Sequence, residues 1–323
     1  EMLSELLGEL NVSHTGSGAR SSSSAFPTAE LGVFVSPVAG SGALHVDEVV
    51  AGGPFDNSRT KLQKGSLITA IDGEKLEAGK DYFPLLNDKV GKRLLVSFRT
   101  ASGEQVDEVI RPISSSALND LLYKRWVKQR AEEVERVSKG TLGYVHIPSM
   151  GDPSFRTVYS DVMGKYYQKK GIVIDIRYNG GGRLHEDIEA FFTGKHYADQ
   201  VVRDRQYSEM SSRRWNRPSV LVTCEADYSN AHGTPWVYQH LKVGKVVGMP
   251  VAGTMTSVNW VTLLDPSVYF GIPAVGFRLF DGRYLENTQM EPDVVVPLDP
   301  TKVLQGIDTQ IEKAVEVLRT ETK

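Results

Sequence analysis

The stretch GIVIDIRYNGGG, residues 171–182, decides the fold of this chain. It begins with a short, nearly continuous run of isoleucine and valine, which is typical of a strand buried on both faces of a parallel sheet. The run leads into three consecutive glycines, and a helical pattern, LHEDIEAFFTG, follows at residues 184–194. A strand, a glycine turn and a helix in that order predict one repeat of an α/β domain.

Strands and helices continue to alternate on both sides of this stretch. The expected strands include TLGYVHIPS at 141–149 and SVLVTCEA at 219–226. The expected helices are SFRTVYSDVMGKYYQ at 154–168, AHGTPWVYQHL at 231–241 and GIDTQIEKAVEVLR at 306–319. The alternation predicts a mixed α/β core over residues 116–323.

The first third of the chain has a different texture. Residues 31–112 consist of short β-branched runs broken by turn residues, which predicts a separate β-rich domain with bounds at about 29–115. Residues 1–28 precede it. They begin with leucines spaced as on one face of a short helix and continue into a glycine- and serine-rich stretch that is typical of a linker. A charged helical stretch at 117–138 follows the β-rich domain.

Composition excludes several classes of function. Lys and Arg total 37 against 40 Asp and Glu, and no basic stripe interleaved with aromatic residues suits a nucleic acid. The single cysteine, Cys224, excludes an internal disulfide and a thiolate metal site, and no HExxH motif is present, so we expect no metal and no cofactor. No signal peptide and no membrane span are visible. Because the chain begins with Glu, we expect a fragment whose upstream part is missing.

Two strand-to-helix crossings are the first places to look for a site, because open α/β sheets bind ligands at the carboxyl ends of their strands. At the first, Asn179 to Gly182 either present bare backbone N–H groups to an anion or form an ordinary turn. A phosphate loop is excluded, since neither GK[ST] nor GxGxxG occurs there. At the second, Ser229 begins a helix, either as an exposed nucleophile beside the Asn230 N–H or as an ordinary N-cap.

A serine nucleophile needs a base. His232 lies one turn along the same helix, which is a poor geometry for accepting the Ser229 proton, and Lys242 and Lys245 lie at its far end. Among the seven histidines, His14 lies directly beside another potential relay residue, Ser13. The best candidate base is therefore more than two hundred residues away from the nucleophile.

Five segments, taken in their order along the chain, resemble the S41 serine peptidases and specifically their tricorn protease branch. They are GYVHIPSM (143–150), GIVIDIRYNGGG (171–182), EADYSNAHG (225–233), GKVVGMPVAGT (244–254) and DGRYLENTQMEPDVVVP (281–297). The resemblance covers essentially the whole chain, because that branch carries a PDZ domain between a small N-terminal segment and its catalytic core. It implies an α/β catalytic core of the S41/ClpP-crotonase-like type with an inserted PDZ domain.

The resemblance also implies the site. It assigns a Ser-His-Ser-Glu tetrad, with Ser229 as nucleophile, His14 as base, and Ser13 and Glu286 as the groups that orient the base. The oxyanion hole falls on the N–H groups of Gly182 and Asn230. The substrate-binding positions it suggests are Gly180, Gly181 and, as an acidic specificity residue, Asp199.

Partners and location follow from the same resemblance. It implies a serine endopeptidase acting on peptides or unfolded polypeptide, a hexameric homo-oligomer, and β-propeller domains upstream in the full-length protein. The location is cytoplasmic, or periplasmic or secreted if the missing N-terminus carries a signal peptide. Two alternatives remain open. One is a catalytically inactive PDZ scaffold that binds peptides, and the other is a lysine-dependent peptidase, although VAGTMTS at 251–257 contains no lysine where that branch has one.

Overall fold

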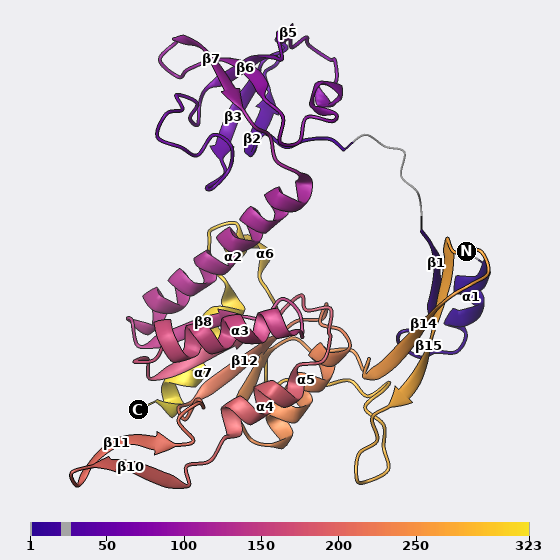
Figure 1. The fold of residues 1–323 in the computed structure, drawn as a ribbon, viewed down its shortest axis with the longest axis vertical. Coiled ribbons are helices and arrows are strands. Elements are labelled where there is room, and N and C mark those ends of the chain that lie inside the picture. Colours follow the sequence, from indigo (N-terminus) through magenta and orange to yellow (C-terminus); the bar gives the residue numbers. More distant parts are fainter. Residues whose placement is uncertain (1, 21–26, 323) are drawn as a thin grey trace. The chain divides into compact units, whose positions relative to one another are not determined.

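The computed structural model describes residues 2–20 and 27–322 (Figure 1). The chain divides into two compact units, one made of Glu1–Ser21 with Gln129–Lys323 and the other of Ser22–Lys128. The boundary at Lys128 falls inside the long helix α2, Ser115–Ser138. The serine run expected as linker at 21–24 lies outside the described residues.

A five-stranded parallel sheet forms the centre of the first unit. In spatial order its strands are β8 (Leu142–His146), β9 (Gly171–Asp175), β12 (Ser219–Thr223), β13 (Lys245–Gly248) and β16 (Val294–Val295). β8, β9 and β12 are buried along their whole length, which is why their sequences are apolar runs without alternation. The predicted mixed α/β fold is confirmed.

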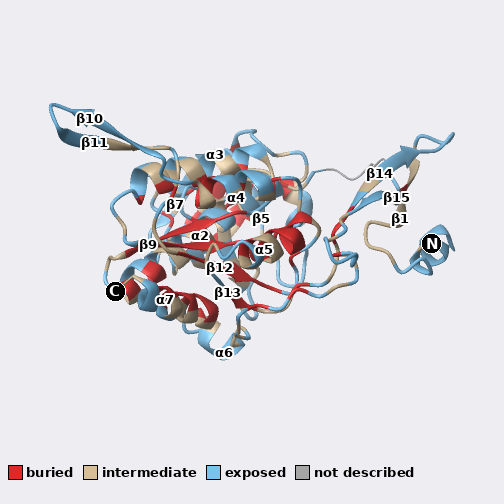
Figure 2. Cartoon of the chain, turned by 90° about the horizontal axis from the view of Figure 1, so that it is seen from below, coloured by how far each residue is buried: buried red, intermediate tan, exposed pale blue. Residues whose placement is uncertain are grey.

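Helices cover both faces of this sheet. The strands lie side by side in chain order, and right-handed crossovers therefore place the connecting helices on one face. Figure 2 shows α3 and α4 on one side and α7 on the other. The helices are α3 (Asp152–Ser160), which continues as the π-helix η2 (Asp161–Lys165), α4 (His185–Thr193), α5 (Asn230–His240), α6 (Pro300–Val303) and α7 (Thr309–Glu321). Fully buried side chains such as Ile174, Leu221 and Val246 make the core between them.

A buried ion-pair cluster ties the carboxyl end of β9 to the start of α7. The Arg177 guanidinium lies 2.7 Å from Asp175 and 2.9 Å from Asp308, and all three side chains are almost completely buried. Asp308 also caps α7 by accepting from the N–H groups of Gln310 and Ile311. Burial alone raises the pKa of Asp175, but the Arg177 charge outweighs it and lowers that pKa. The turn that follows β9 therefore starts from a rigid base.

The N-terminal segment belongs to this unit through a small antiparallel sheet. Helix α1 (Met2–Gly8) is followed by strand β1 (Gly16–Ala19), which pairs with β15 (Val268–Gly276), and β15 pairs in turn with β14 (Thr256–Thr262). The linker prediction was therefore wrong for residues 16–19. The sequence GSGA has no β-forming side chains, and the strand forms because its backbone completes a ladder with β15.

A hairpin that the sequence did not predict extends from the same unit. Strands β10 (Ala198–Val202) and β11 (Arg205–Met210) pair with each other, and every residue of β10 is exposed. In Figures 1 and 2 the hairpin and the β1–β15–β14 sheet lie at opposite ends of the unit. Its pattern is weak because no apolar face is buried against a core.

The second unit is an antiparallel β structure with its own core. Its sheet has the order β2-β3-β4-β6-β7, with the short β5 paired to β4. The bounds are β2 (Val33–Pro37), β3 (Leu44–Val49), β4 (Leu67–Ile71), β5 (Glu74–Lys75), β6 (Leu94–Arg99) and β7 (Gln105–Ile110), with a 3-10 helix η1 at Phe83–Leu86. Phe55, Ile68 and Phe98 are among its fully buried side chains.

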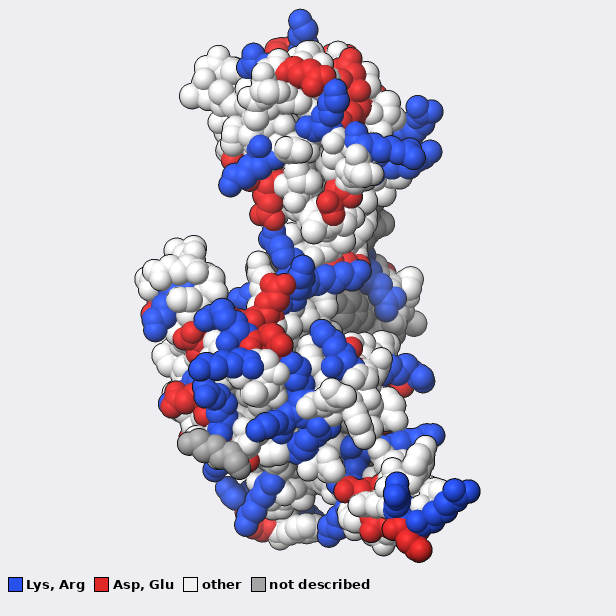
Figure 3. All heavy atoms as spheres, turned by 90° about the vertical axis from the view of Figure 1, so that its left-hand side faces the viewer, with Lys and Arg blue, Asp and Glu red and all other residues white. Residues whose placement is uncertain are grey.

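On the face drawn in Figure 3, Lys and Arg side chains are interspersed with Asp and Glu. Within the described ranges, no helix is at once long enough and apolar enough to cross a membrane.

Candidate active site

Ser229 stands on a strained turn between β12 and α5. Its backbone has φ 59° and ψ −122°, a combination that residues with a side chain rarely adopt and that clusters at functional sites. The Ser229 hydroxyl makes no capping bond to the helix, so an ordinary N-cap serine does not describe it. Its N–H instead donates to Thr254 Oγ1 at 2.8 Å. The turn thus aims the hydroxyl away from the helix.

His14 meets this hydroxyl from the other end of the chain. Its Nε2 lies 2.8 Å from Ser229 Oγ, across 215 positions of sequence. The backbone N–H of His14 donates to the Tyr228 hydroxyl at 2.8 Å, and the two rings lie with centroids 4.8 Å apart. His14 also has a left-handed backbone, with φ 64°. The segment between α1 and β1 is therefore docked where its histidine reaches the serine turn.

Ser13 and Glu286 extend the contact behind the imidazole. Ser13 Oγ lies 2.8 Å from His14 Nδ1 and donates to Glu286 Oε2 at 3.0 Å. The Ser13 N–H donates to the other carboxylate oxygen at 2.6 Å. When Nε2 accepts from Ser229, Nδ1 carries the proton and donates to Ser13. Each group then donates to the next, from Ser229 through His14 and Ser13 to Glu286. The four residues of the predicted tetrad lie in one continuous hydrogen-bonded row.

The environment keeps His14 suited to accept a proton. Partial burial lowers the pKa of His14 below its ordinary value, while the negative charge of Glu286 acts in the opposite direction. The net lowering favours the neutral imidazole near pH 7, which is the form that can take a proton from Ser229.

The glycine turn lies directly against the serine turn. Gly181 has φ +96°, and a Cβ there would stand 2.5 Å from Ser229 Cβ. Gly182 has φ +139°, and a Cβ there would stand 2.1 Å from the Met150 carbonyl oxygen. At Gly180 a Cβ would meet nothing within 4 Å. Two of the three glycines are therefore required by close approach of backbone, as expected for a turn that must come near a reacting group.

Two backbone N–H groups of the glycine turn and the serine turn have no acceptor in the described part of the chain. Within the described part of the chain, neither the Gly182 N–H nor the Asn230 N–H donates to another group. Asn230 begins α5, where the first N–H groups have no partner inside the helix and the helix dipole is positive. Neither donor is therefore committed to another group of the described chain.

Asn179 and Asp227 fasten the two turns together. Asn179 Oδ1 accepts from the Gly181 N–H at 2.8 Å, and the Asn179 carbonyl accepts from the Tyr228 N–H at 2.9 Å. Asp227 accepts from the N–H groups of Cys224 and Asn179, at 3.0 and 3.3 Å. Burial raises the pKa of Asp227 to about 8. Sequence analysis considered Asn179 only as a backbone donor and missed Asp227, since nothing in the type or spacing of these residues marks their side chains.

The Asn230 side chain fixes a second helix. Its Oδ1 accepts from the N–H groups of Leu184 and His185, at 3.0 and 3.2 Å, and its Nδ2 lies 2.7 Å from His185 Nδ1. The first residue of α5 therefore holds the start of α4, which follows the glycine turn.

Other residues considered from the sequence lie elsewhere. Asp199 is on the exposed hairpin, where it accepts from His196 and Gln206 at 2.9 and 2.7 Å, and no contact between it and the tetrad occurs in the described structure. His232 is buried with its Nε2 at 3.0 Å from the Thr288 carbonyl, so it packs in the core. Lys245 pairs with Asp293 at 3.0 Å.

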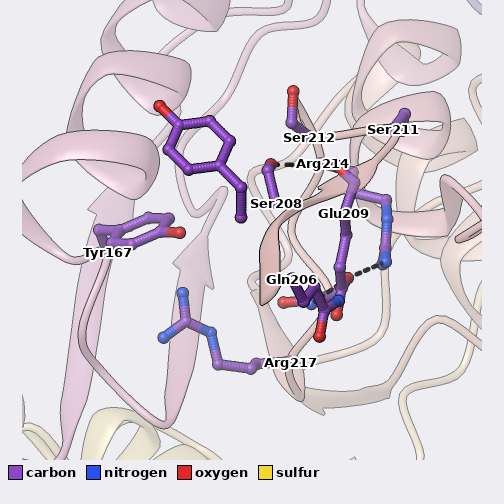
Figure 4. Close-up of a pocket in the computed structure, with 10 residues that line it drawn as sticks. Tyr167, Gln206, Ser208, Glu209, Ser211, Ser212, Arg214 and Arg217 are labelled. Atoms are coloured by element: carbon purple, nitrogen blue, oxygen red, sulfur yellow. Dashed lines mark hydrogen bonds and ion pairs between the residues drawn. The ribbon is translucent and has the colours of Figure 1, made fainter. Parts of the chain in front are cut away.

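The pocket drawn in Figure 4 is separate from these turns. It has a volume of about 540 Å³ and is lined by residues of β11 and the stretch after it, such as Glu209 and Arg217, and by Tyr167, which follows η2. Arg214 on its wall is paired with Glu209 at 2.7 Å. None of the four tetrad residues lines it. Among the described residues, no group of three or more His, Cys, Asp or Glu side chains could hold a metal ion.

Comparison with known proteins agrees with the motifs. Residues 141–296 match the model of peptidase family S41. The chain is 27% identical to the tricorn protease of Thermoplasma acidophilum over 261 residues, which is 80% of this chain and 24% of that protein. It is 26% identical to the putative tricorn protease homolog 2 of Streptomyces coelicolor over 338 residues, covering 99% of this chain and 28% of that protein.

A solved structure gives the same fold. The crystal structure of the tricorn protease superposes with a TM-score of 0.78 at 23% identity, covering 98% of this chain and 31% of that one. The predicted resemblance to the tricorn protease branch of the S41 peptidases is confirmed. The chain spans about a quarter of the length of the curated relatives, 24% and 28% for the two named above.

Proposed function

We propose that this relative of the tricorn proteases, with its peptidase family S41 match at residues 141–296, is a serine endopeptidase that hydrolyses peptides or unfolded polypeptide through an acyl-enzyme. The observation that carries the proposal is the 2.8 Å contact between His14 Nε2 and Ser229 Oγ. A base within hydrogen-bond reach of a strained, uncapped serine is the minimum that nucleophilic catalysis by serine requires.

Acylation begins at this contact. His14 Nε2 takes the Ser229 proton as Oγ attacks the carbonyl carbon of the scissile peptide bond. The oxygen of the tetrahedral intermediate becomes negative and accepts from the free N–H groups of Gly182 and Asn230. The C–N bond then breaks, His14 gives its proton to the leaving amine, and the acyl group stays on Ser229.

In deacylation, water attacks the acyl-enzyme in the place that the amine has left. His14 removes a proton from a water molecule, the resulting hydroxide attacks the ester carbon, and the same two N–H groups receive the oxyanion. The bond to Ser229 breaks and Oγ recovers its proton from His14. The products are a carboxylic acid and the free enzyme.

Ser13 and Glu286 act on the imidazole. Nδ1–H donates to Ser13 Oγ and the Ser13 hydroxyl donates to Glu286, which fixes the tautomer with an unprotonated Nε2. The carboxylate also stabilises the imidazolium that exists after each proton transfer. Because Ser13 lies between the ring and Glu286, the carboxylate acts on the imidazolium through the Ser13 hydroxyl.

The substrate main chain lies along the glycine turn in this proposal. Gly180 and Gly181 offer a surface free of side chains beside Ser229. We retain Asp199 as the proposed acidic specificity residue. Its exposed position on a hairpin means that the hairpin must approach the substrate for this role to hold.

The domain organisation, the assembly and the location are proposed from the similarity to the tricorn proteases. Residues 29–115 act as a PDZ-like domain between an N-terminal segment, 1–28, and the catalytic core, 116–323. In the second unit, the edge position of β2 supports strand addition by an extended peptide. The full-length protein carries upstream propellers, assembles as a hexamer and works in the cytoplasm. The comparisons do not favour the inactive scaffold considered above.

The experiment is hydrolysis of an unfolded protein and of short fluorogenic peptides by the chain and by Ser229→Ala. We expect cleavage by the former, and loss of cleavage in the variant with an unchanged circular dichroism spectrum. Cleavage by Ser229→Ala at the original rate would refute the assignment of the nucleophile.

A further inference from the structure

Thr254 and Thr256 lie on one short segment that touches both the nucleophile and the base. The segment leads from β13 into β14, whose first residue is Thr256. Thr254 Oγ1 accepts from the Ser229 N–H at 2.8 Å. Two residues on, Thr256 Oγ1 lies 3.0 Å from His14 Nδ1 and 3.0 Å from Ser13 Oγ. Three consecutive residues therefore bridge the serine turn and the N-terminal segment.

We propose that Thr256 is a positioning residue whose hydroxyl holds the His14 ring, and that Thr254 to Thr256 act as one clamp that sets the distance between base and nucleophile. This inference rests on the proposed function, since it assigns roles around the same serine and histidine.

The hydrogen inventory supports a defined role for the Thr256 hydroxyl. The Ser13 hydroxyl donates to the Glu286 carboxylate, so its oxygen is left to accept. The single proton on His14 Nδ1 then faces two acceptor oxygens, on Ser13 at 2.8 Å and on Thr256 at 3.0 Å. Thr256 keeps its own proton for Ser13, whose Oγ and carbonyl oxygen lie 3.0 and 3.4 Å away. With His14 protonated at Nδ1, each of these donors has an acceptor among the described residues.

Burial makes this arrangement matter. Thr256 is 8% exposed, so water does not readily replace its hydroxyl as a partner for Nδ1. A second acceptor at Nδ1 also favours the imidazolium over the neutral ring, because a hydrogen bond to a charged group is the stronger one. Glu286 is the charged group that shifts the pKa of the His14 ring, and it raises that pKa.

Met255 fixes the segment to the nucleophile helix. Met255 lies between the two threonines in sequence and is buried, and a Cβ added at Gly233 on α5 would stand 2.6 Å from Met255 Cε. The segment therefore packs directly on the helix that begins after Ser229. A displacement of α5 is carried to Thr254 and Thr256, and through them to His14, by close packing.

The experiment compares Thr256→Val, Thr256→Ser, Thr254→Val and the matched control Thr262→Val. Thr262 is an exposed residue at the other end of β14. Valine keeps the shape of threonine and removes the hydroxyl, while serine keeps the hydroxyl. Each variant is measured for kcat and KM on one fluorogenic peptide across pH, with the melting temperature as a check of folding.

We expect Thr256→Val to lower kcat by about 10- to 100-fold with little change in KM, and to move the acidic limb of the pH profile to lower pH. Thr256→Ser restores most of the activity and the position of the limb. Thr254→Val lowers kcat without moving the limb, because Thr254 touches the nucleophile backbone and not the ring. Thr262→Val behaves as the unmodified chain.

Two results would overturn the inference while leaving the proposed function intact. One is a Thr256→Val variant that matches Thr262→Val. The other is an equal loss in Thr256→Val and Thr256→Ser, which would assign the effect to packing. An independent measurement covers the case in which a variant does not fold or the chain does not cleave: the ¹⁵N shifts of the His14 ring in the unmodified protein. Protonation at Nδ1 in the neutral ring supports the clamp, and protonation at Nε2 refutes it.

Discussion

Gly181 and Ser229 are in such close contact that a single added carbon at Gly181 would stand 2.5 Å from Ser229 Cβ and 3.0 Å from its Oγ. Carbon atoms that are not bonded to each other do not approach this closely, so either the glycine turn or the serine turn would have to shift. The contact joins the turn that offers N–H donors to the turn that offers the nucleophile.

Gly181→Ala should therefore abolish most activity without removing any functional group. We expect a loss of at least about 100-fold in kcat, the cost of misplacing reacting groups by about 1 Å. Gly164→Ala on η2 is the matched control, because its Cβ would meet nothing within 4 Å and the residue lies outside the proposed site. Steady-state kinetics on one peptide compare the two. Equal activities would mean that the glycine turn has no part in the reaction.

The pH profile of kcat/KM should have an acidic limb set by His14. Protonated His14 cannot accept the Ser229 proton, so activity rises as pH rises through the His14 pKa. Because burial lowers that pKa, the limb should lie below the ordinary value of 6.5. His14→Ala should lower kcat by at least about 10³-fold and remove the limb. A limb that persists in His14→Ala would assign the base to another residue, as the lysine alternative requires.

Glu286→Gln tests the far end of the tetrad. The carboxylate raises the pKa of His14 against the effect of burial, so its neutralisation should lower that pKa further and move the acidic limb to lower pH. The variant should also lower kcat by about 10-fold, since the imidazolium loses a stabilising charge. The same kinetic titration measures both effects. A limb displaced to higher pH would contradict this electrostatic role of the Glu286 carboxylate.

Asp227 should make stability depend on pH. Its pKa is raised from 3.8 to about 8 in the folded chain, so the folded state holds a proton that the unfolded state has lost between these values. The stabilisation from this group is therefore complete below pH 3.8 and is lost as pH rises toward 8. Asp227→Asn should remove that slope from a series of urea unfolding curves. A variant with the original slope would show that Asp227 does not titrate in this range.

The α/β core was predictable because its signals are local. The buried strands β9 and β12 are apolar runs, and the helices after them have their own period, so residues 171–182 and 219–233 indicate both turns directly. The strand β1 and the β10–β11 hairpin were not predictable in this way. One is held by pairing with β15, more than two hundred residues away, and the other buries no apolar face.

The same difference between local signals and long-range contacts applies to the candidate site. Ser229 and the glycines could be identified from turn chemistry, and His14 from its place beside Ser13, whereas Glu286 was named through family resemblance. Thr256 was missed altogether, since a threonine at the start of a strand has no feature that marks a hydroxyl 3.0 Å from a distant imidazole. Contacts between segments far apart in sequence leave no periodic trace in either one.

The most direct test of the central claim is covalent labelling by a fluorophosphonate, followed by mass spectrometry of the digested protein. The account predicts one modified residue, Ser229, with labelling abolished in Ser229→Ala and strongly slowed in His14→Ala, because the phosphonate reacts with the activated hydroxyl. A label on a different residue, or full labelling of Ser229→Ala, would contradict it.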